Sequence, residues 1–577
     1  MRRSTAGRCC ECTGPTPTAP KVRAHWLTSV HPTGRRDRSP HHGGKASINA
    51  ESRESGCYGV RFRARLSVCG QLTMLTATAD GLLPSMATLC WSRRDSDHPA
   101  IIEDGGRTWT WRMLAHAAAQ TARTLDGTAS RPVAFSAPNG GAFAAIMMGI
   151  WLAGAVPAPV SPRLPRAERQ RVLASIDPVR AIVTAGLDFE ADVVVDVDDL
   201  AVARLDNGSM PPLPRADPQA PGIVICTSGT TGTPKPVVHT LRGIWGLIDG
   251  VARKPVDPDQ PRPASGAGPL RVDSRPMNHT GAIYGLISTL WRGRPLVVMQ
   301  RFEPVRYAEL VRLYDIETLN LVPTMIRMLL DAAEEVGTLG PPAKVATSGT
   351  APLPDSWREE FEARFGVPVQ RNYGSTEVST VAVEPLDDAL SGNRRLAAAG
   401  KISPGVQVEI RNDDNRPMPV GDTGSIWVRS DTLRPKVIGQ GAVTEQDGWI
   451  DTGDVGRVDA DDYIYITGRK RELIIRGGLK IVPNEIETAL LLHSAVTEAA
   501  VAGVPDERLG EVPAAWVRLR AAATEDDLRE HVRSQLASYK VPVSVYFVDD
   551  FPRTESGKVR KHDLVARLHN SATAESS

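Results

Sequence analysis

One stretch, from Ile223 to Thr240, constrains the fold of this chain more than any other and reads IVICTSGTTGTPKPVVHT. Its apolar start is typical of a buried β-strand, and the threonine, serine and glycine residues that follow are typical of a loop. In such a loop, glycines let backbone N–H groups turn toward an anion, hydroxyl groups add donors, and Lys235 adds a positive charge. The stretch therefore predicts a strand that leads into a phosphate-binding loop. The residues with this predicted role are Thr227, Ser228, Gly229, Thr230, Thr231, Gly232 and Lys235.

The spacing of this loop differs from that of a Walker loop, which needs GxxxxGK followed by a serine or threonine that binds magnesium. Here the spacing is GxxGxxK, and Pro236 follows the lysine. A run of small polar residues is also typical of an ordinary surface loop. The string TSGTTGTPK, however, resembles the ATP-phosphate loop of the adenylate-forming superfamily, which includes acyl-CoA synthetases, peptide-synthetase adenylation domains and beetle luciferases. The resemblance implies an α/β fold with a large N-terminal domain of several subdomains and a small, mobile α+β C-terminal domain.

Length and charge set the outline of the chain. At 577 residues it is too long for one hydrophobic core, so two or more domains are expected. The net charge of +1 gives no sign of nucleic-acid binding. The first 73 residues carry 13 Lys and Arg against 4 Asp and Glu, which leaves 55 against 63 in the remainder. The basic excess is therefore confined to the head of the chain.

This head, residues 1–75, shows no sustained hydrophobic period and is rich in arginine, serine, glycine and proline, so we expect it to be disordered. We interpret it as an upstream over-extension of the reading frame, with Met74 or Met86 as alternative starts. It holds five of the seven cysteines. Such an uneven distribution does not build a disulfide framework, which predicts a reduced, cytoplasmic protein.

The most apolar stretch, Gly141–Val160, is uncharged but contains Pro157 and Pro159, which predicts a buried helix running into a strand and no membrane span. Helices and strands are expected to alternate around it. We expect two strands about an Asp-Gly-Gly turn within 100–111, a helix to 125, strands at 133–136 and 181–184, and a helix after 165. After the phosphate loop we expect a helix carrying Leu241 and Ile244, whose positive dipole end would face the anion site.

Two further motifs, ATSGTAPLP at 346–354 and RNYGSTE at 371–377, resemble the adenine and magnesium motifs of the superfamily. A tyrosine face can stack on adenine, the Thr376 hydroxyl can bind the α-phosphate, and Glu377 offers a hard oxygen ligand to Mg²⁺. In these motifs Thr350 replaces a common glycine. The nucleotide contacts expected here are Gly349, Thr350, Asn372, Tyr373, Gly374 and Thr376.

The motif DGWIDTGDVG at 447–456 resembles the ribose motif, in which Asp454 would accept hydrogen bonds from the ribose hydroxyls. In the motif ITGRKRELIIRGGLKIVPNEIE that follows, the resemblance implies that Ile466 and Arg469 contact the nucleotide and that Arg471 is the hinge between domains. Two adjacent glycines leave a channel without side chains, which a pantetheine arm needs. The CoA-binding residues expected are Gly477 and Gly478.

Two more residues complete the predicted catalytic set with Lys235 and Glu377. PMNHTGAIYGL at 276–286 resembles the motif in which His279 would line the acyl pocket, and FPRTESGKVRK at 551–561 resembles the mobile loop that carries a catalytic lysine, Lys558. The last domain is expected to contain a strand, loop and helix within 473–492, strands at 499–504, 514–519 and 543–548, and a helix from 524. The predicted division is a head at 1–75, an N-terminal AMP-binding domain at 76–470, a mobile C-terminal domain at 471–570 and a tail at 571–577.

The branch of the superfamily is predicted from two features. GGLKIVPNEIE resembles acyl-CoA synthetases, and no aspartate lies between Pro276 and Tyr284 to pair with an amino-acid ammonium group. We therefore expect a carboxylic acid:CoA ligase that uses ATP, Mg²⁺ and CoA on a hydrophobic acid, because Ile283, Tyr284 and Leu286 suggest an apolar pocket. An enzyme that loads an acyl-carrier protein is the main alternative. An inactive nucleotide-binding homologue is the other, although the charged residues of the motifs are present.

Overall fold

The computed structural model describes residues 83–84, 86–203, 215–227, 235–252, 270–340, 343–430, 436–437 and 445–574. The predicted head, residues 1–75, lies outside these ranges, and so do loop residues 228–234. Among the described residues, no helix has the length and apolar character that a bilayer-spanning segment needs.

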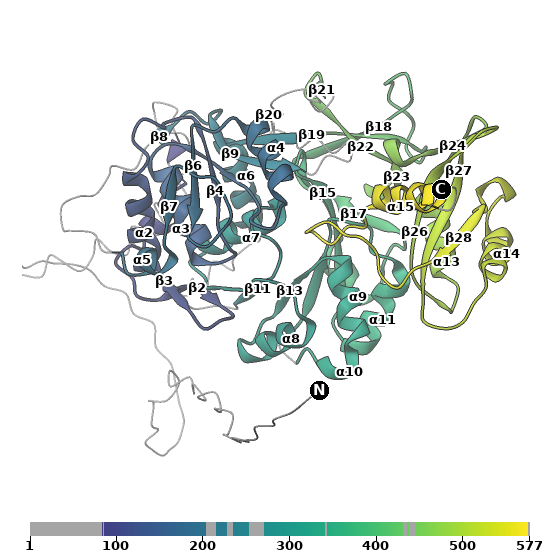
Figure 1. Ribbon diagram of the computed structural model, residues 1–577, viewed down its shortest axis with the longest axis horizontal. Coiled ribbons are helices and arrows are strands. Elements are labelled where there is room, and N and C mark those ends of the chain that lie inside the picture. Colours follow the sequence, from purple (N-terminus) through teal and green to yellow (C-terminus); the bar gives the residue numbers. More distant parts are fainter. Residues whose placement is uncertain are drawn as a thin grey trace, which may run out of the picture. The chain divides into compact units, whose positions relative to one another are not determined.

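Two small four-stranded sheets, one parallel and one mixed with β3 antiparallel to β2, lie in the first region (Figure 1). The first has the order β5-β4-β6-β7 and the second the order β11-β12-β2-β3. The strands are β2 (Pro99–Glu103), β3 (Thr108–Thr110), β4 (Pro132–Ser136), β5 (Val156–Pro159), β6 (Arg180–Thr184), β7 (Val193–Val195), β11 (Arg271–Asp273) and β12 (Leu296–Val298), and a short pair joins β1 (Leu83–Pro84) to β8 (Arg215–Ala216). The helices are α1 (Thr88–Trp91), α2 (Trp111–Arg123), α3 (Gly141–Leu152), α4 (Arg166–Ile176), α5 (Val197–Ala201), α6 (Leu241–Ala252) and α7 (Thr280–Trp291).

Helix α3 confirms the interpretation of the apolar stretch. All of its residues are buried, and the chain continues into β5. A helix that is apolar on every side must lie inside the protein, and α3 packs against α2 in the largest core cluster. The hairpin of β2 and β3 and the strands β4 and β6 also lie where the sequence predicted them.

The phosphate-loop stretch forms an antiparallel hairpin, which corrects one expectation. Strand β9 (Pro221–Thr227) ends where the loop begins, and β10 (Lys235–Thr240) returns alongside it, with Lys235 opposite Thr227 and Thr240 opposite Pro221. A third strand, β20 (Lys436–Val437), pairs with β10. Because β10 separates the loop from α6, the helix begins at the opposite end of the hairpin from the loop. Its dipole therefore does not face the loop, contrary to the prediction.

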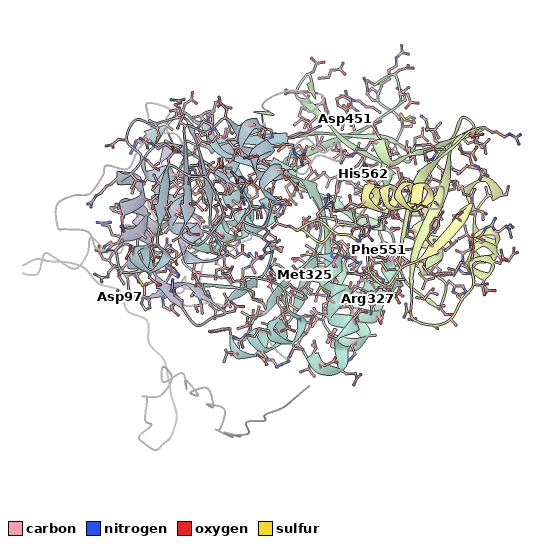
Figure 2. All side chains as sticks on the ribbon, in the orientation of Figure 1. Asp97, Met325, Arg327, Asp451, Phe551 and His562 are labelled. Carbon is pink, nitrogen blue, oxygen red and sulfur yellow. The ribbon has the colours of Figure 1, made fainter. Side chains whose placement is uncertain are left out.

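A ten-stranded sheet organises the next region in the order β13-β14-β15-β16-β17-β23-β22-β19-β18, with β21 paired to β22. Its strands are β13 (Thr318–Leu321), β14 (Val345–Ser348), β15 (Val369–Ser375), β16 (Ser379–Val383), β17 (Ala398–Ile402), β18 (Val406–Arg411), β19 (Gly424–Ser430), β21 (Glu445–Gln446), β22 (Trp449–Val458) and β23 (Tyr463–Arg469). The helices are α8 (Pro304–Leu313), α9 (Pro323–Asp331), α10 (Ala333–Val336), α11 (Asp355–Phe365) and α12 (Leu386–Ser391). Arg327 on α9 (Figure 2) pairs with Glu360 on α11 at 3.0 Å, which joins these two helices.

A separate five-stranded sheet follows the 3-10 turn at Lys470–Glu472, in the order β25-β24-β27-β26 with β28 paired to β27. Its strands are β24 (Ile474–Arg476), β25 (Leu479–Ile481), β26 (Val496–Asp506), β27 (Gly510–Leu519) and β28 (Ser544–Phe547). The helices are α13 (Pro483–Leu491), α14 (Glu525–Gln535), the 3-10 turn Ser538–Lys540 and α15 (Lys561–Ala574).

A local signal in the sequence explains one of these helices, and another was not predicted. α14 begins after Thr524, whose hydroxyl accepts the N–H of Asp527 while the Asp527 carboxylate accepts the N–H of Thr524. α15 was not predicted, although Leu564 on it is buried against Trp516 and Phe551 (Figure 2). The change of sheet at Lys470–Glu472 coincides with the predicted domain boundary, which stays a prediction.

Candidate active site

A buried carboxylate joins the predicted ribose motif to the predicted adenine motif. Asp454 on β22 is 4% exposed, and its Oδ1 lies 3.0 Å from Nε of Arg469 on the neighbouring strand β23. Its Oδ2 accepts a hydrogen bond of 2.8 Å from the Tyr373 hydroxyl. Burial raises the pKa of Asp454, and Arg469 and the Tyr373 hydrogen bond act in the opposite direction. Each carboxylate oxygen has a second lone pair, so both can still accept a hydroxyl of a ligand.

Lys558 is half-buried and adds a positive charge to this group. The pKa of its amine is lowered to about 8, mainly by loss of solvent; Arg469 and Arg471 also lower this pKa, whereas Asp454 and Glu377 raise it. Three cations thus face two carboxylates, and one of these carboxylates is already paired with Arg469. The local excess of positive charge fits an anionic ligand such as a phosphate.

Thr376 and Glu377 follow β15, and a contact with α7 fixes the first of them. The Thr376 Oγ1 lies 2.8 Å from Oγ1 of Thr280, the first residue of α7. The backbone N–H of Glu377 donates to the Ser375 hydroxyl at 3.2 Å. The Glu377 carboxylate is half-buried and acts electrostatically on both Arg471 and Lys558. This hard oxygen group, beside cations that fit phosphate, suits Mg²⁺.

The predicted adenine residues pack closely with one another. A Cβ on Gly349 would lie 2.0 Å from Asn372 Oδ1, and one on Gly374 would lie 1.9 Å from the Ser379 carbonyl oxygen, so both positions require glycine. Thr350 has φ of +73°, a conformation that a β-branched residue rarely adopts. The glycine that the family commonly has at this position would remove this strain.

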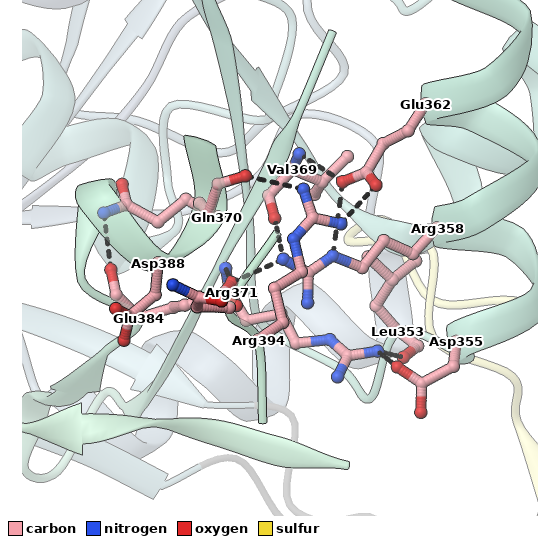
Figure 3. Close-up of polar contacts among 12 residues, drawn as sticks. Leu353, Asp355, Arg358, Glu362, Val369, Gln370, Arg371, Glu384, Asp388 and Arg394 are labelled. Carbon is pink, nitrogen blue, oxygen red and sulfur yellow. Dashed lines mark hydrogen bonds and ion pairs between the residues drawn. The ribbon is translucent and has the colours of Figure 1, made fainter. Parts of the chain in front are cut away.

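Buried ion pairs hold the strand that carries Asn372 and Tyr373 (Figure 3). Arg358 on α11 lies 2.7 Å from Glu384, and both side chains are less than one-tenth exposed. The same Glu384 carboxylate accepts the backbone N–H of Arg371 at 3.1 Å. Arg371 in turn donates to the Leu353 carbonyl at 2.8 Å. The network therefore joins the 346–354 motif to the 371–377 motif.

The loop that carries Lys558 contacts three segments of the larger region. The Thr324 hydroxyl donates to the Gly557 carbonyl at 2.8 Å, and the Ser161 hydroxyl donates to Glu555 at 2.5 Å. The predicted acyl-pocket residue His279 is half-buried, and its buried Nε2 lies 3.8 Å from Glu555. Burial lowers the pKa of His279, and Glu555 acts in the opposite direction. The sequence motif contained Glu555, but no spacing signal indicated these contacts.

The remaining predicted residues have mixed outcomes. Lys235 and Thr227 face each other across the hairpin at the start of the loop, and Ser228, Gly229, Thr230, Thr231 and Gly232 lie outside the described residues. Ile466 on β23 packs against an apolar cluster of the large sheet. The predicted CoA residues Gly477 and Gly478 both have positive φ, +55° and +87°, and connect β24 to β25. A tight hairpin turn with two residues of positive φ explains both glycines without CoA.

Two expected pocket residues lie elsewhere. Ile283 and Leu286 are fully buried in the core cluster that contains α3. Tyr284 instead meets His239 on β10, with ring centroids 5.8 Å apart and nearly perpendicular planes. His239 was not singled out from the sequence, because one histidine among the apolar residues of a strand gives no signal of function.

The large α/β region followed by a small α+β region that contains the Lys558 loop is the fold of adenylate-forming enzymes. The chain belongs to the AMP-binding enzyme family. The family model for AMP-binding enzymes matches residues 90–435, and the model for their C-terminal domain matches residues 485–558. The chain is thus an AMP-forming acid–thiol ligase with ATP and CoA as substrates.

Three similar proteins show the range of the family. The chain is 32% identical to the sulfoacetate–CoA ligase of Cupriavidus necator, over 81% of this chain and 94% of that protein. It is 29% identical to the fatty acid–[acyl-carrier-protein] ligase ScoC of Streptomyces coeruleorubidus, over 82% of this chain and 93% of that protein. The structure of o-succinylbenzoate CoA synthetase from Bacillus subtilis with its acyl-adenylate intermediate matches with a TM-score of 0.72 at 24% identity. The match covers 84% of this chain and 98% of that protein.

Proposed function

We propose that this protein converts a hydrophobic carboxylic acid to its CoA thioester through an acyl adenylate, with Lys558, Glu377, Asp454 and Arg469 as its principal site residues. The observation that carries the proposal is the convergence of these four side chains, which come from four separate sequence motifs. Asp454 and Arg469 would hold the ribose. Lys558 would contact the α-phosphate and the acid carboxylate.

The first step needs cations because the carboxylate of the acid must approach the negatively charged α-phosphate of ATP. A carboxylate oxygen of the acid forms a bond to the α-phosphorus of ATP, and the bond from that phosphorus to the bridging oxygen of pyrophosphate breaks. Charge gathers on the phosphoryl oxygens during this exchange, so a preorganised positive charge stabilises the transition state. Lys558 supplies this charge below pH 8, because its amine is then protonated.

Glu377 would hold the magnesium ion, and when bound the ion supplies positive charge to the phosphates. Lys235 stands at the start of β10, where it would reach phosphates in the loop that joins β9 to β10. Thr376 would donate to the α-phosphate only after its hydroxyl turns from Thr280.

In the second step the thiol sulfur of CoA forms a bond to the acyl carbon, the bond from that carbon to the AMP oxygen breaks, and the thiol proton is released. We propose that Arg471 is the hinge that moves Lys558 away before the thiol enters, because it lies in the turn between the two sheets. Gly477 and Gly478 would then approach the adenylate.

Product analysis shows which thiol, that of CoA or that of a carrier protein, accepts the acyl group. The purified protein is incubated with ATP, magnesium and a panel of hydrophobic acids, together with CoA or with a phosphopantetheinylated carrier protein, and thioesters are measured by mass spectrometry. We expect acyl-CoA. Acylation of the carrier without acyl-CoA would instead support the alternative acceptor, which similarity to ScoC favours.

A further inference from the structure

A pair of polar side chains, His239 and Tyr284, lies behind the Thr376 motif and has no role in the chemistry above. His239 is 1% exposed; its ring makes one weak hydrogen bond with the Thr376 backbone, and its other ring nitrogen has no partner among the described residues. Tyr284 is half-buried, and its hydroxyl is buried without a partner among the described residues. Buried polar groups are nearly always hydrogen-bonded, so an open ring nitrogen beside an open hydroxyl fits a ligand that bonds to both.

Both side chains are placed by contacts with the predicted α-phosphate residue. Thr280 on α7 contacts Thr376 at 2.8 Å, and Tyr284 lies one helical turn further along the same face of α7. The His239 ring on β10 is close enough to the Thr376 backbone to make a weak hydrogen bond with it. The pair is therefore near the point at which the acid must approach the α-phosphate.

The electrostatics of the pair select the kind of group that it can bind. Burial lowers the pKa of His239 to about 4 and raises the pKa of Tyr284, so both are neutral at neutral pH. Within the part of the chain that the structure describes, no charged side chain shifts the pKa of either group. A second anionic group on the acid would thus be buried without a counter-charge, which is unfavourable. A neutral imidazole and a phenol each offer one donor and at least one acceptor, which matches a hydroxyl group.

We propose that His239 and Tyr284 determine the acid specificity of this enzyme, and that its substrate is a hydrophobic carboxylic acid bearing a neutral hydroxyl group. This inference rests on the proposed function, because it assigns the acid of the same reaction. It also separates this chain from a ligase for an acid with a second negative charge, such as the relative that acts on sulfoacetate.

The test compares acids that differ by one hydroxyl. The pairs are phenylacetate with 4-hydroxyphenylacetate, cinnamate with 4-hydroxycinnamate, and octanoate with 8-hydroxyoctanoate, and octanedioate supplies a second anion. Acid-dependent exchange of pyrophosphate into ATP gives kcat/KM for each acid. In the wild type we expect a preference for the hydroxylated acid of about tenfold or more in at least one pair, because an unfilled polar site rejects the analogue that lacks its partner. Octanedioate should be the poorest acid of its series.

Two variants test whether His239 and Tyr284 cause the preference for the hydroxylated acid. Tyr284→Phe and His239→Leu should each bring the ratio of the two kcat/KM values toward one. Tyr307→Phe is the matched control, because the Tyr307 hydroxyl is also buried but lies near Asp273 and the Asn320 backbone. The control should keep the wild-type ratio. A loss of stability cancels in this ratio, since both acids are measured on the same protein.

Three results would overturn the inference. They are equal use of both members of every pair by the wild type, a ratio that survives in both variants, and a preference for octanedioate. In each of these cases exchange still occurs, so the proposed function stands. Absence of exchange with every acid would overturn the proposed function and the inference together.

Discussion

Replacing Arg358 by methionine should destabilise the large region strongly and weaken ATP binding. Arg358 lies 2.7 Å from Glu384, and the two side chains are 3% and 7% exposed. Methionine fills a similar volume but leaves the Glu384 carboxylate buried without its arginine. The Glu384 carboxylate also accepts the N–H of Arg371, next to the predicted adenine contacts, so a shift of Glu384 would be transmitted to them.

The expected loss of stability follows from the burial of the Arg358–Glu384 ion pair. Breaking a fully buried ion pair by removing one partner typically costs about 3–5 kcal/mol. The hydrogen bond from Arg371 compensates part of the uncovered charge, which favours the lower end of that range. Glu384→Leu in the Arg358→Met background should recover part of the loss, because the unpaired charge is then absent.

The assay is urea denaturation followed by tryptophan fluorescence, with attention to the transition midpoint at constant slope. Arg533→Met is the control, because Arg533 pairs with Glu530 on the exposed side of α14 and its loss should change stability by less than about 0.5 kcal/mol. The KM for ATP in pyrophosphate exchange reports the effect on the site. A loss of less than about 1 kcal/mol in Arg358→Met, with unchanged KM, would refute the claim that this pair supports the adenine motifs.

Further predictions concern the two half-reactions. Lys558→Ala should lower acid-dependent pyrophosphate exchange about a hundredfold or more, since it removes a charge of the transition state, yet still form thioester from a preformed acyl adenylate; equal loss of both would refute the separation. The kcat/KM for exchange should fall as pH rises above about 8, because Lys558 then loses its proton, and Lys558→Arg should lack this decline. Arg471→Pro should preserve exchange and abolish thioester formation, whereas a parallel loss of both, with lower thermal stability, would make Arg471 structural. Asparagine tolerates positive φ, so Gly478→Asn should keep the turn. If this turn contacts CoA, the variant should preserve exchange and abolish thioester formation. If Gly478 serves the turn alone, both steps should stay intact.

Much of the fold could be predicted because the residues of a single helix or strand are enough to indicate it. The uncharged residues of α3 could form only a buried helix, and Thr524 with Asp527 marks the start of α14. Long-range pairing was harder to predict. The short run that forms β10 becomes a strand because it pairs with β9 and β20, and the sequence carries no signal of that pairing. The missed helix α15 has its apolar residue Leu564 buried by packing on the last sheet, which its local sequence indicates only weakly.

The site was predictable where a motif brings several functional residues together. Asp454 and Arg469, in neighbouring motifs, were both expected to contact the nucleotide, and they are opposite residues on adjacent strands. Their roles in binding nucleotide stay predictions. Sequence reasoning failed where function depends on isolated residues. Tyr284 was expected to line an apolar pocket, but its ring contact with His239 joins β10 to α7, and no sequence pattern links these two residues.

The central claim is that this protein joins a carboxylic acid to AMP, and its most direct measurement is pyrophosphate release from ATP across the acid panel without CoA and then with it. We predict release that requires acid, ATP and magnesium together, and sustained turnover with free AMP once CoA is added. Release of pyrophosphate without any acid, or no release with any acid of the panel, would contradict the account.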